Sequence, residues 1–358
     1  MKKVLILSTI WGHKSVGKAI YDVLSDAGYE AVQEVLRVDP FSSKSYKAFY
    51  RFFPWLFTAT FQMSKSEKMN RFFDIYFEKS YLKTLEQMIK KHRPEIVISS
   101  YFAFDSSIEK LNKKYKFRYY NAFTDPRTFS NIHISRSGIN LVFDQTALNK
   151  VKKLAPNSKS LIVGWFAEKK YYQKLSKNES RKKIGVDESI LTFCITGGSE
   201  GTYDVLKIIS SLASKGKRLQ ILFMCGKNKQ LFELVNKMRK IFPDNITLIP
   251  FAYTNDMNLF FKASDLVIGK AGPSTIFESV ACLVPFFAIT HITGQEDGNL
   301  EVIRKYNLGL VEENPLRASK KIKQVIKNPS ILDKFQKPIK KLSEYNQKSA
   351  EKLIKIIA

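Results

Sequence analysis

Apolar and polar positions follow two rhythms along the chain. A short, mainly apolar run at residues 4–8 is followed by apolar residues three or four positions apart between Val16 and Ala27. A second strand-like stretch follows at 31–38. Such runs are typical of parallel strands buried on both faces, and the wider spacing is typical of a helix with one buried face. The order predicts the opening of a doubly wound α/β domain. A helix is expected at 81–91, and further strands at 95–100, 117–123, 141–143 and 161–163.

A second series of the same kind begins at residue 190. Strands are expected at 190–196, 219–225, 246–250 and 265–269, with helices up to about Leu212, through Phe242 and at 255–263. The pattern predicts an α/β protein with two Rossmann-like, doubly wound domains that face a cleft. The expected parts are an N-terminal domain over 1–164, a polar, lysine-rich linker with a short helix over 165–189, a C-terminal domain over 190–335, and a C-terminal helix over 336–358 that packs back toward the N-terminal domain.

The composition is that of a folded and strongly basic protein. Of the 358 residues 44% are apolar, and the formal net charge is +26. Such a charge attracts nucleic acid, acidic lipid headgroups or a phosphorylated substrate without distinguishing them. The sequence has neither a signal-peptide pattern nor a run of 18 apolar residues, so a cytoplasmic protein is expected. Three cysteines lack metal-ligand spacing and are predicted to be buried thiols in a reducing compartment, namely Cys194, Cys225 and Cys282.

Residues 46–81 carry thirteen aromatic side chains interleaved with basic ones. An amphipathic segment that lies in a membrane interface has this composition, with rings at headgroup depth and cations on anionic lipid. A pair of helices packed on the domain core accounts for it about equally well, and stacking on single-stranded nucleic acid is a weaker third alternative. The candidate membrane or acceptor contacts are Arg51, Phe52, Phe53, Trp55, Phe57 and Lys65.

A helix start suited to an anion is predicted at Gly272, Pro273, Ser274 and Thr275. Proline at the first helical position loses no hydrogen bond, and the free N–H groups that follow it, together with the helix dipole, favour a diphosphate. Glu278 lies about one turn further on, where its carboxylate can accept hydrogen bonds from two ribose hydroxyls. An ordinary helix start with a solvent-facing glutamate is the alternative interpretation.

Two further loops are polar and contain glycine. Residues 197–201 read GGSEG and stand between an expected strand and an expected helix, so they form a second candidate phosphate cradle. Their spacing matches neither the dinucleotide fingerprint nor the P-loop. Residues 294–299 read GQEDGN, in which Gln295 and Glu296 offer amide and carboxylate groups suited to hexose hydroxyls. Solvated loop residues are the alternative there.

His13 and Asp125 each follow an expected strand at its carboxyl end, where doubly wound sheets bind ligands. A histidine with an ordinary pKa near 6.5 suits general-base catalysis, although a loop histidine can equally be structural. Asp125 is a base, an orienting group or a helix cap. No Asp-x-Asp motif occurs, so we expect no metal on the diphosphate and no other cofactor.

Residues 190–311 resemble the C-terminal domain of the GT-B glycosyltransferases of family 28. The resemblance is carried by Pro250-Phe251, the run from Gly272 to Glu278, and the run from Gly294 to Asn299, which are similar to those of monogalactosyldiacylglycerol synthases and bacterial diacylglycerol glucosyltransferases. In the N-terminal half, Gly12-His13 stands where the family has its catalytic histidine, and Thr124-Asp125 resembles its Thr-Asp pair. Ile10-Trp11 replaces the small residues that the family carries before the histidine.

The resemblance implies an inverting transfer of a hexose from UDP-glucose or UDP-galactose to a lipid hydroxyl, with diacylglycerol as the acceptor. It also implies a peripheral protein on the inner face of the cell membrane, with anionic lipids and no nucleic acid as partners. His13 and Asp125 are the implied catalytic residues. The residues implied to bind the uracil, ribose, diphosphate and sugar of the donor are Gly198, Ser199, Phe251, Ala252, Gly272, Pro273, Ser274, Thr275, Glu278, Gln295, Glu296 and Asn299.

Three other interpretations stay open. An N-acetylglucosaminyl transferase that acts on a polyprenyl-linked peptidoglycan precursor shares the architecture and also uses a lipid acceptor. A UDP-sugar 2-epimerase shares the architecture but needs no lipid-binding segment. A non-enzymatic basic binding protein would leave the motifs at 272–278 and 294–299 unexplained.

Overall fold

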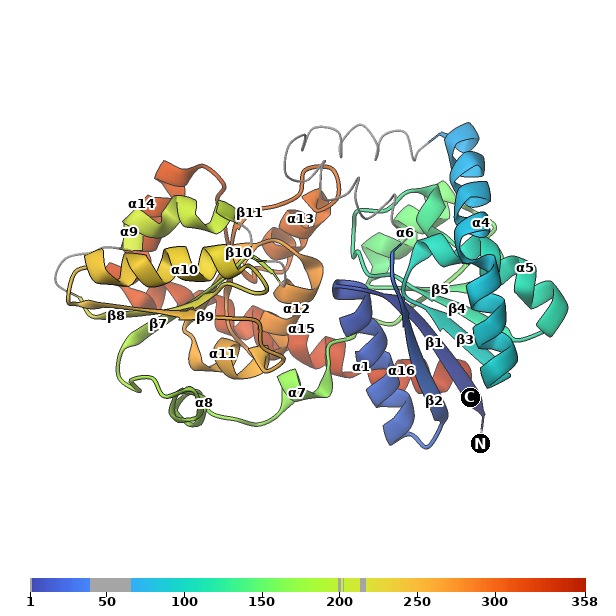
Figure 1. Ribbon diagram of the computed structural model, residues 1–358, viewed down its shortest axis with the longest axis horizontal. Coiled ribbons are helices and arrows are strands. Elements are labelled where there is room, and N and C mark those ends of the chain that lie inside the picture. The colour runs from blue at the N-terminus through green and yellow to red at the C-terminus, as the bar shows by residue number, and fades with distance from the viewer. Residues whose placement is uncertain (1, 39–65, 199–200, 202, 213–216) are drawn as a thin grey trace. The chain divides into compact units, whose positions relative to one another are not determined.

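The chain forms two compact units, shown in a computed structural model that describes residues 2–38, 66–198, 201, 203–212 and 217–358 (Figure 1). Unit 1 comprises Met1–Lys169, Ile292–Asn299 and Tyr345–Ala358, and unit 2 comprises Lys170–His291 and Leu300–Glu344. Each unit therefore contains segments that are far apart in the sequence. The loop at 294–299, which the sequence groups with the C-terminal half, belongs to unit 1.

Unit 1 is built on a six-stranded sheet in the order β2-β1-β3-β4-β5-β6, with every neighbouring pair parallel. The strands expected from the apolar runs are all present. They are β1 Lys3–Thr9, β2 Glu30–Leu36, β3 Ile96–Ser99, β4 Arg118–Ala122, β5 Ile139–Val142 and β6 Lys159–Ile162. The helices are α1 Gly12–Asp26, α4 Glu67–His92, α5 Asp105–Tyr115, α6 Gln145–Leu154 and α16 Ser349–Ile357, with the 3-10 turns η1 Phe102–Phe104 and η2 Asn131–His133.

Helix α4 is much longer than the pattern predicts, because it begins at Glu67 rather than at residue 81. Four of its side chains, spaced every fourth residue, are buried in the core of unit 1: Phe77, Tyr81, Leu85 and Ile89. Phe72 on the same helix stays 61% exposed. The described part of the aromatic segment is thus a core-packing helix, which was one of the two main interpretations. The candidate contacts Arg51, Phe52, Phe53, Trp55, Phe57 and Lys65 lie outside the described residues.

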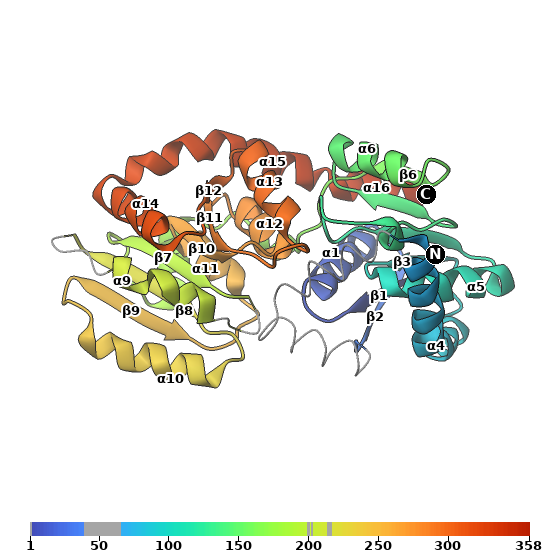
Figure 2. The same cartoon turned by 90° about the horizontal axis from the view of Figure 1, so that it is seen from above.

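Both chain ends belong to unit 1, where Figure 2 marks them. The backbone at the C-terminus receives hydrogen bonds from two side chains of β4: Arg118 Nη2 donates to the Ile357 carbonyl at 2.5 Å, and the Tyr120 hydroxyl donates to the Ile356 carbonyl at 3.2 Å. Among the described helices, none has the length and apolar character that crossing a bilayer requires.

Unit 2 carries a second six-stranded parallel sheet, in the order β12-β11-β10-β7-β8-β9. Its strands are β7 Leu191–Thr196, β8 Leu219–Met224, β9 Ile246–Phe251, β10 Leu266–Lys270, β11 Phe286–Thr290 and β12 Gly309–Val311. Its helices are α7 Lys169–Tyr172, α8 Lys177–Ile184, α9 Ile209–Leu212, α10 Lys229–Met238, α11 Met257–Ala263, α12 Pro273–Ala281, α13 Asp297–Lys305, α14 Pro315–Lys327 and α15 Gln336–Gln347, of which α7, α13 and α15 also contribute residues to unit 1. The 3-10 segments are η3 Tyr203–Ile208, η4 Arg239–Ile241 and η5 Pro329–Phe335.

Three details of the C-terminal half differ from the sequence-based expectation. The segment after Gly201 is a 3-10 stretch followed by one α turn, not a single helix to Leu212. Residues 297–299 of the expected polar loop form the first turn of α13. The sequence analysis also leaves β11 and β12 unassigned. The three cysteines are buried free thiols, as predicted.

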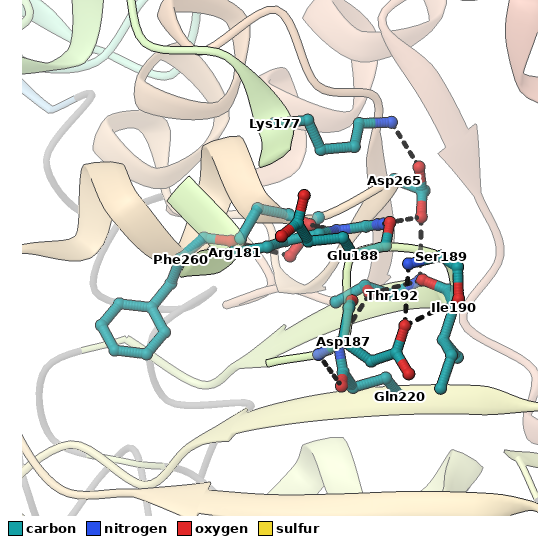
Figure 3. A network of polar contacts seen from close by, with 12 residues as sticks. Lys177, Arg181, Asp187, Glu188, Ser189, Ile190, Thr192, Gln220, Phe260 and Asp265 are labelled. Atoms are coloured by element: carbon teal, nitrogen blue, oxygen red, sulfur yellow. Dashed lines mark hydrogen bonds and ion pairs between the residues drawn. The ribbon is translucent and has the colours of Figure 1, made fainter. Parts of the chain in front are cut away.

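The linker expected at 165–189 is held to unit 2 by a polar network (Figure 3). Arg181 of α8, with a side chain 5% exposed, donates from Nη2 to Asp265 Oδ2 at 2.9 Å and from Nε to the Ala263 carbonyl at 2.8 Å. Asp265 also accepts from the backbone N–H of Thr192 at 2.8 Å, and Lys177 pairs with its other oxygen. This one carboxylate therefore joins α8 to the start of β7 and of β10.

We predict that Asp265→Ala lowers the free energy of unfolding by about 3 kcal/mol, because it leaves the buried Arg181 guanidinium without its counter-charge. Lys182→Ala, which removes an exposed pair with Glu188, is the matched control and should change it by less than about 0.5 kcal/mol. Urea unfolding followed by circular dichroism measures both. Equal values for the two variants would contradict the anchoring role of Asp265.

Candidate active site

The candidate base of unit 1, His13, lies at a point where the strand order of the sheet reverses. β1 stands between β2 and β3 in the sheet. The chain passes from β1 to β2 on one side and only later reaches β3 on the other side, so the carboxyl ends of β1 and β3 form a topological switch point. His13 follows β1, and Ser100 follows β3. His13 is the second residue of α1, not part of a loop as expected.

The His13 ring is oriented by backbone and hydroxyl groups. Its Nδ1 lies 2.6 Å from the Ser100 carbonyl oxygen and 3.0 Å from Thr124 Oγ1. The Tyr101 ring packs edge-on at 4.9 Å, and the Ser100 hydroxyl donates to the His13 carbonyl at 3.0 Å. A carbonyl oxygen can only accept, so Nδ1 carries the proton and Nε2 carries the free lone pair. Among the described residues Nε2 has no hydrogen-bond partner.

The His13 imidazole is neutral over the physiological range. Burial lowers its pKa to about 4, and the hydrogen bond to Ser100 opposes this only in part. The ring is therefore in its proton-accepting form. The chain enters α1 through Trp11, whose φ of 63° and ψ of −138° are rare for a residue other than glycine.

A small pocket opens beside His13, between the carboxyl ends of β3 and β4. Its lining combines aromatic rings with a few polar groups: Ser100, Phe102, Asn121, Ala122, Phe123, Thr124, Asp125, Phe129 and His133. Asp125, the second predicted catalytic residue, thus lines this pocket, while the Ser100 carbonyl and Thr124 make the contacts with His13 Nδ1. The sequence analysis gave no role to His133, and an isolated histidine nine residues after Thr124 carries no local motif that would have revealed it.

The segment from Thr124 to Phe129 is fixed by a buried ion pair. Arg127 Nη1 lies 2.7 Å from Asp144 Oδ1, and Nη2 contacts Oδ2, with the arginine side chain 4% exposed. Lys150 Nζ donates to the Arg127 carbonyl at 2.6 Å. Such pairs constrain geometry more than they add net stability. Here the constraint falls on the backbone that presents Thr124 to His13.

The loop at 294–299 packs on this same segment. The Gly298 N–H donates to Thr128 Oγ1 at 2.9 Å, and a Cβ on Gly298 would lie 2.2 Å from that of Arg127. Glu296 is buried, and its Oε2 accepts from the Ile292 N–H at 2.8 Å, while Asn299 is fully buried and Gln295 is half-buried. The glycine therefore serves close packing within unit 1, and the Glu296 carboxylate closes its own turn.

In unit 2 the glycine loop after β7 and the turn after β10 both lie at the switch point of the sheet. β7 lies between β8 and β10, so the loop after β7 and the turn after β10 share one edge. Gly198 has a φ of 81°, and a Cβ on Gly201 would lie 2.1 Å from the Cys225 carbonyl oxygen. Asn228 Nδ2 donates to the Gly201 carbonyl at 3.0 Å. Ser199 lies outside the described residues.

The turn after β10 has the geometry predicted for a helix start. Gly272 is the N-cap of α12 and Pro273 its first residue. The Ser274 hydroxyl is buried and has no hydrogen-bond partner among the described residues. An unpaired buried hydroxyl costs free energy that a ligand oxygen can recover. Thr275 and Glu278 on the same helix are half-buried.

Phe251 ends β9 at the same edge of the sheet, and its ring packs on Phe260 at 4.6 Å. Its carbonyl accepts from the Cys225 N–H at 2.8 Å, and the next residue, Ala252, is exposed. Beside it, Lys227 Nζ lies 5.2 Å from the centre of the Tyr253 ring, which is 48% exposed. This pair was not predicted from the sequence, although an aromatic residue two positions after a strand in a ligand-binding sheet is a usable signal.

Two family models match the chain. Residues 192–355 match the glycosyltransferase family 28 C-terminal domain, and residues 13–143 match monogalactosyldiacylglycerol (MGDG) synthase. Among curated proteins, a processive diacylglycerol beta-glucosyltransferase of Bacillus pumilus is 24% identical over 87% of this chain and 83% of its own length. Monogalactosyldiacylglycerol synthase 3 of Arabidopsis thaliana is 28% identical over 48% of this chain and 36% of its own length.

Solved structures with the same fold cover the whole chain. MurG of Acinetobacter baumannii aligns with a TM-score of 0.62 and 13% identity over 100% of this chain and 99% of that chain. The spinosyn rhamnosyltransferase SpnG in complex with thymidine diphosphate aligns with a TM-score of 0.63 and 12% identity over all of both chains. At these identities the likeness shows the fold alone, and it agrees with the two doubly wound sheets predicted from the sequence.

We predict that His13 and His133 titrate near pH 4 in the folded protein, because burial lowers the pKa of each to about that value. Since an unfolded histidine titrates near pH 6.5, the unfolded chain binds more protons between pH 6.5 and 4, and the stability that these residues contribute falls as the pH drops through that window. Carbon-13 NMR of the imidazole Cε1–H groups, assigned with His13→Gln and His133→Gln, measures the midpoints. Midpoints near 6.5 for both would contradict this electrostatic description.

Proposed function

Because the chain belongs to glycosyltransferase family 28 and is a hexosyltransferase with the GT-B fold, we propose that it transfers a hexose from a UDP-sugar to the hydroxyl of diacylglycerol. The names of the similar glucosyltransferase and galactosyldiacylglycerol synthase support diacylglycerol as the acceptor. UDP-glucose and UDP-galactose are the proposed donors. The transfer is proposed to invert the anomeric carbon.

Unit 2 is the proposed donor-binding unit. The first-turn N–H groups of α12 and the unpaired Ser274 hydroxyl would hold the diphosphate, with Gly198 and Ser199 of the other glycine loop. Glu278 would accept hydrogen bonds from the ribose, and Phe251 and the Ala252 backbone would frame the uracil. In this proposal N–H dipoles stabilise the departing diphosphate, without a metal ion. Gln295, Glu296 and Asn299, which belong to unit 1, are proposed as sugar contacts from the sequence alone.

The observation that carries the proposal is the state of His13 in unit 1. Its Nδ1–H is committed to the Ser100 carbonyl, so the Nε2 lone pair is the only site that can accept a proton. His13 Nε2 would take the proton of the acceptor hydroxyl as the hydroxyl oxygen bonds to the anomeric carbon. The bond from that carbon to the diphosphate breaks, UDP leaves with its electron pair, and the imidazolium returns its proton to solvent.

A peripheral location on the cytoplasmic face of the membrane follows from a lipid acceptor and belongs to the same proposal. The net charge of +26 favours anionic lipid over a neutral surface. The aromatic and basic residues between Arg51 and Lys65 are the proposed lipid contacts from sequence.

A second candidate is the transfer of N-acetylglucosamine to a polyprenyl-linked peptidoglycan precursor. It is favoured by a UDP-N-acetylglucosamine–N-acetylmuramyl-(pentapeptide) pyrophosphoryl-undecaprenol N-acetylglucosamine transferase of Aquifex aeolicus, which is 28% identical over 54% of this chain and 55% of its own length. Incubation of the purified protein with each labelled UDP-sugar, and with liposomes that contain either acceptor, separates the two by product mass. Absence of any lipid-linked sugar would refute both.

We predict that His13→Ala lowers kcat at least about 100-fold, because the reaction loses its general base. Binding of UDP, measured by calorimetry, should stay unchanged, since His13 belongs to unit 1. His92→Ala, which changes a half-buried histidine elsewhere in unit 1, is the matched control and should keep wild-type turnover. Wild-type turnover of the His13 variant would remove His13 as the base.

We predict that Glu278→Ala raises KM for the UDP-sugar roughly tenfold or more, because it removes two charge-assisted hydrogen bonds to the ribose. The kcat should change less, since these bonds are present in both the ground state and the transition state. Glu233→Ala, an exposed glutamate of α10, is the control. An unchanged KM for the donor would place the ribose elsewhere.

A further inference from the structure

The pocket beside His13 contains a second neutral histidine. His133, the last residue of η2, lines this pocket with Ser100 and Thr124, which both contact His13 Nδ1. Burial, with smaller contributions from the charges of His13 and Lys150, lowers the pKa of His133 to about 4, although the Ser130 backbone opposes this in part. Both imidazoles are therefore neutral near pH 7, at the same edge of the same sheet.

The two rings carry their protons on opposite nitrogens. The backbone N–H of Ser130 donates to His133 Nδ1 at 3.2 Å. A backbone N–H can only donate, so this nitrogen has no proton and His133 carries its hydrogen on Nε2. His13 has the reverse arrangement, with the hydrogen on Nδ1. The His13 ring thus has an acceptor nitrogen, and the His133 ring, which lines the pocket, has a donor nitrogen.

His133 is held in a fixed position. The Asn121 side chain donates from Nδ2 to the His133 carbonyl at 2.8 Å, and the centres of the Phe102 and His133 rings are 4.3 Å apart. With Nδ1 turned to Ser130, Nε2 lies on the remaining edge of the ring. It has no hydrogen-bond partner among the described residues. A fixed donor on a residue that lines a small pocket can orient a single ligand group that reaches that residue.

We propose that His133 binds the acceptor lipid by donating a hydrogen bond from Nε2–H to an ester carbonyl oxygen of its glycerol group, an inference that rests on the proposed function. The hydroxyl that reacts must give its proton to His13 and keep a lone pair free for the anomeric carbon. A donor on that hydroxyl oxygen would draw electron density from the attacking atom and make it a weaker nucleophile. The ester carbonyls of diacylglycerol only accept, and one of the esters is attached to the glycerol carbon next to the one that carries the hydroxyl.

The proposal makes His133 a determinant of acceptor specificity. A diacylglycerol has ester carbonyls, whereas a dialkylglycerol with ether links presents the same hydroxyl and chains without them. Loss of one hydrogen bond to a neutral acceptor changes binding roughly five- to tenfold. The bond should therefore favour the diester in kcat/KM by that factor, and only while the Nε2–H donor is present.

The test compares matched diester and diether glycerols as acceptors for the full-length wild type, His133→Leu and His133→Gln, in the same vesicles and at saturating UDP-glucose. We expect the wild type to prefer the diester five- to tenfold, the leucine variant to lose the preference, and the glutamine variant, which keeps an N–H donor, to retain part of it. The acid limb of the pH–rate profile should not move, because His13 remains the base. His92→Leu is the control for replacing a half-buried histidine of unit 1.

Each other outcome has a definite meaning. A wild type that uses both lipids equally well, or a preference that survives in His133→Leu, would overturn the role of His133 while leaving the transferase proposal intact. If His133 only caps η2 with Ser130, the leucine variant should lower Tm and reduce turnover of both lipids by the same factor. Should the leucine variant fail to fold, the wild-type preference and the glutamine variant still decide. Absence of transfer to either lipid would refute the proposed function and this inference together.

Discussion

Both units depend on one geometric constraint, which is that every pair of neighbouring strands is parallel. Parallel strands end at the same edge of their sheet, so each crossover returns a loop to that edge. Where the strand order reverses, two such loops are left side by side. In unit 1 they bring His13 to Ser100, and in unit 2 they bring the glycine loop after β7 to the turn before α12. The strand order therefore determines where each candidate site lies, whatever side chains its loops carry.

A buried arginine-aspartate pair then fixes the backbone near each sheet. Arg127 with Asp144 holds the segment that carries Thr124, and Arg181 with Asp265 holds α8 to two strands. Hydrophobic side chains could supply comparable stability, because desolvation consumes much of the attraction between buried charges. What the pairs add is direction. Arg127 donates to both oxygens of Asp144, and Arg181 donates to Asp265 and to the Ala263 carbonyl, so each guanidinium fits only a narrow range of acceptor positions. They set the positions of loops that packing alone would leave loose.

The order of elements could be predicted from the sequence, because the fully buried central strands, such as β3 and β8, are mainly apolar runs. The start of α12 was predictable for a similar reason, since Pro273 has a strong preference for the first helical position. Other features depend on contacts that the sequence does not display. Helix α4 begins as early as Glu67, and its aromatic residues pack on the core of unit 1. His133 lines the pocket because η2 packs against Phe102. The packing of Gly298 on Thr128 joins residues 170 positions apart, which no local pattern reveals.

Trp11 has a strained backbone conformation at the start of α1, close to the candidate base. A positive φ with a ψ of −138° is a conformation in which glycine is unstrained and tryptophan is not, and such strain is worth on the order of 1–3 kcal/mol. His13 lies two residues after Trp11. A directed-evolution campaign that screens variants for heat resistance alone would be drawn to glycine at this position, since relief of strain raises Tm. The same exchange frees the backbone that enters α1, so selection for robustness and selection for turnover would favour different residues at this position.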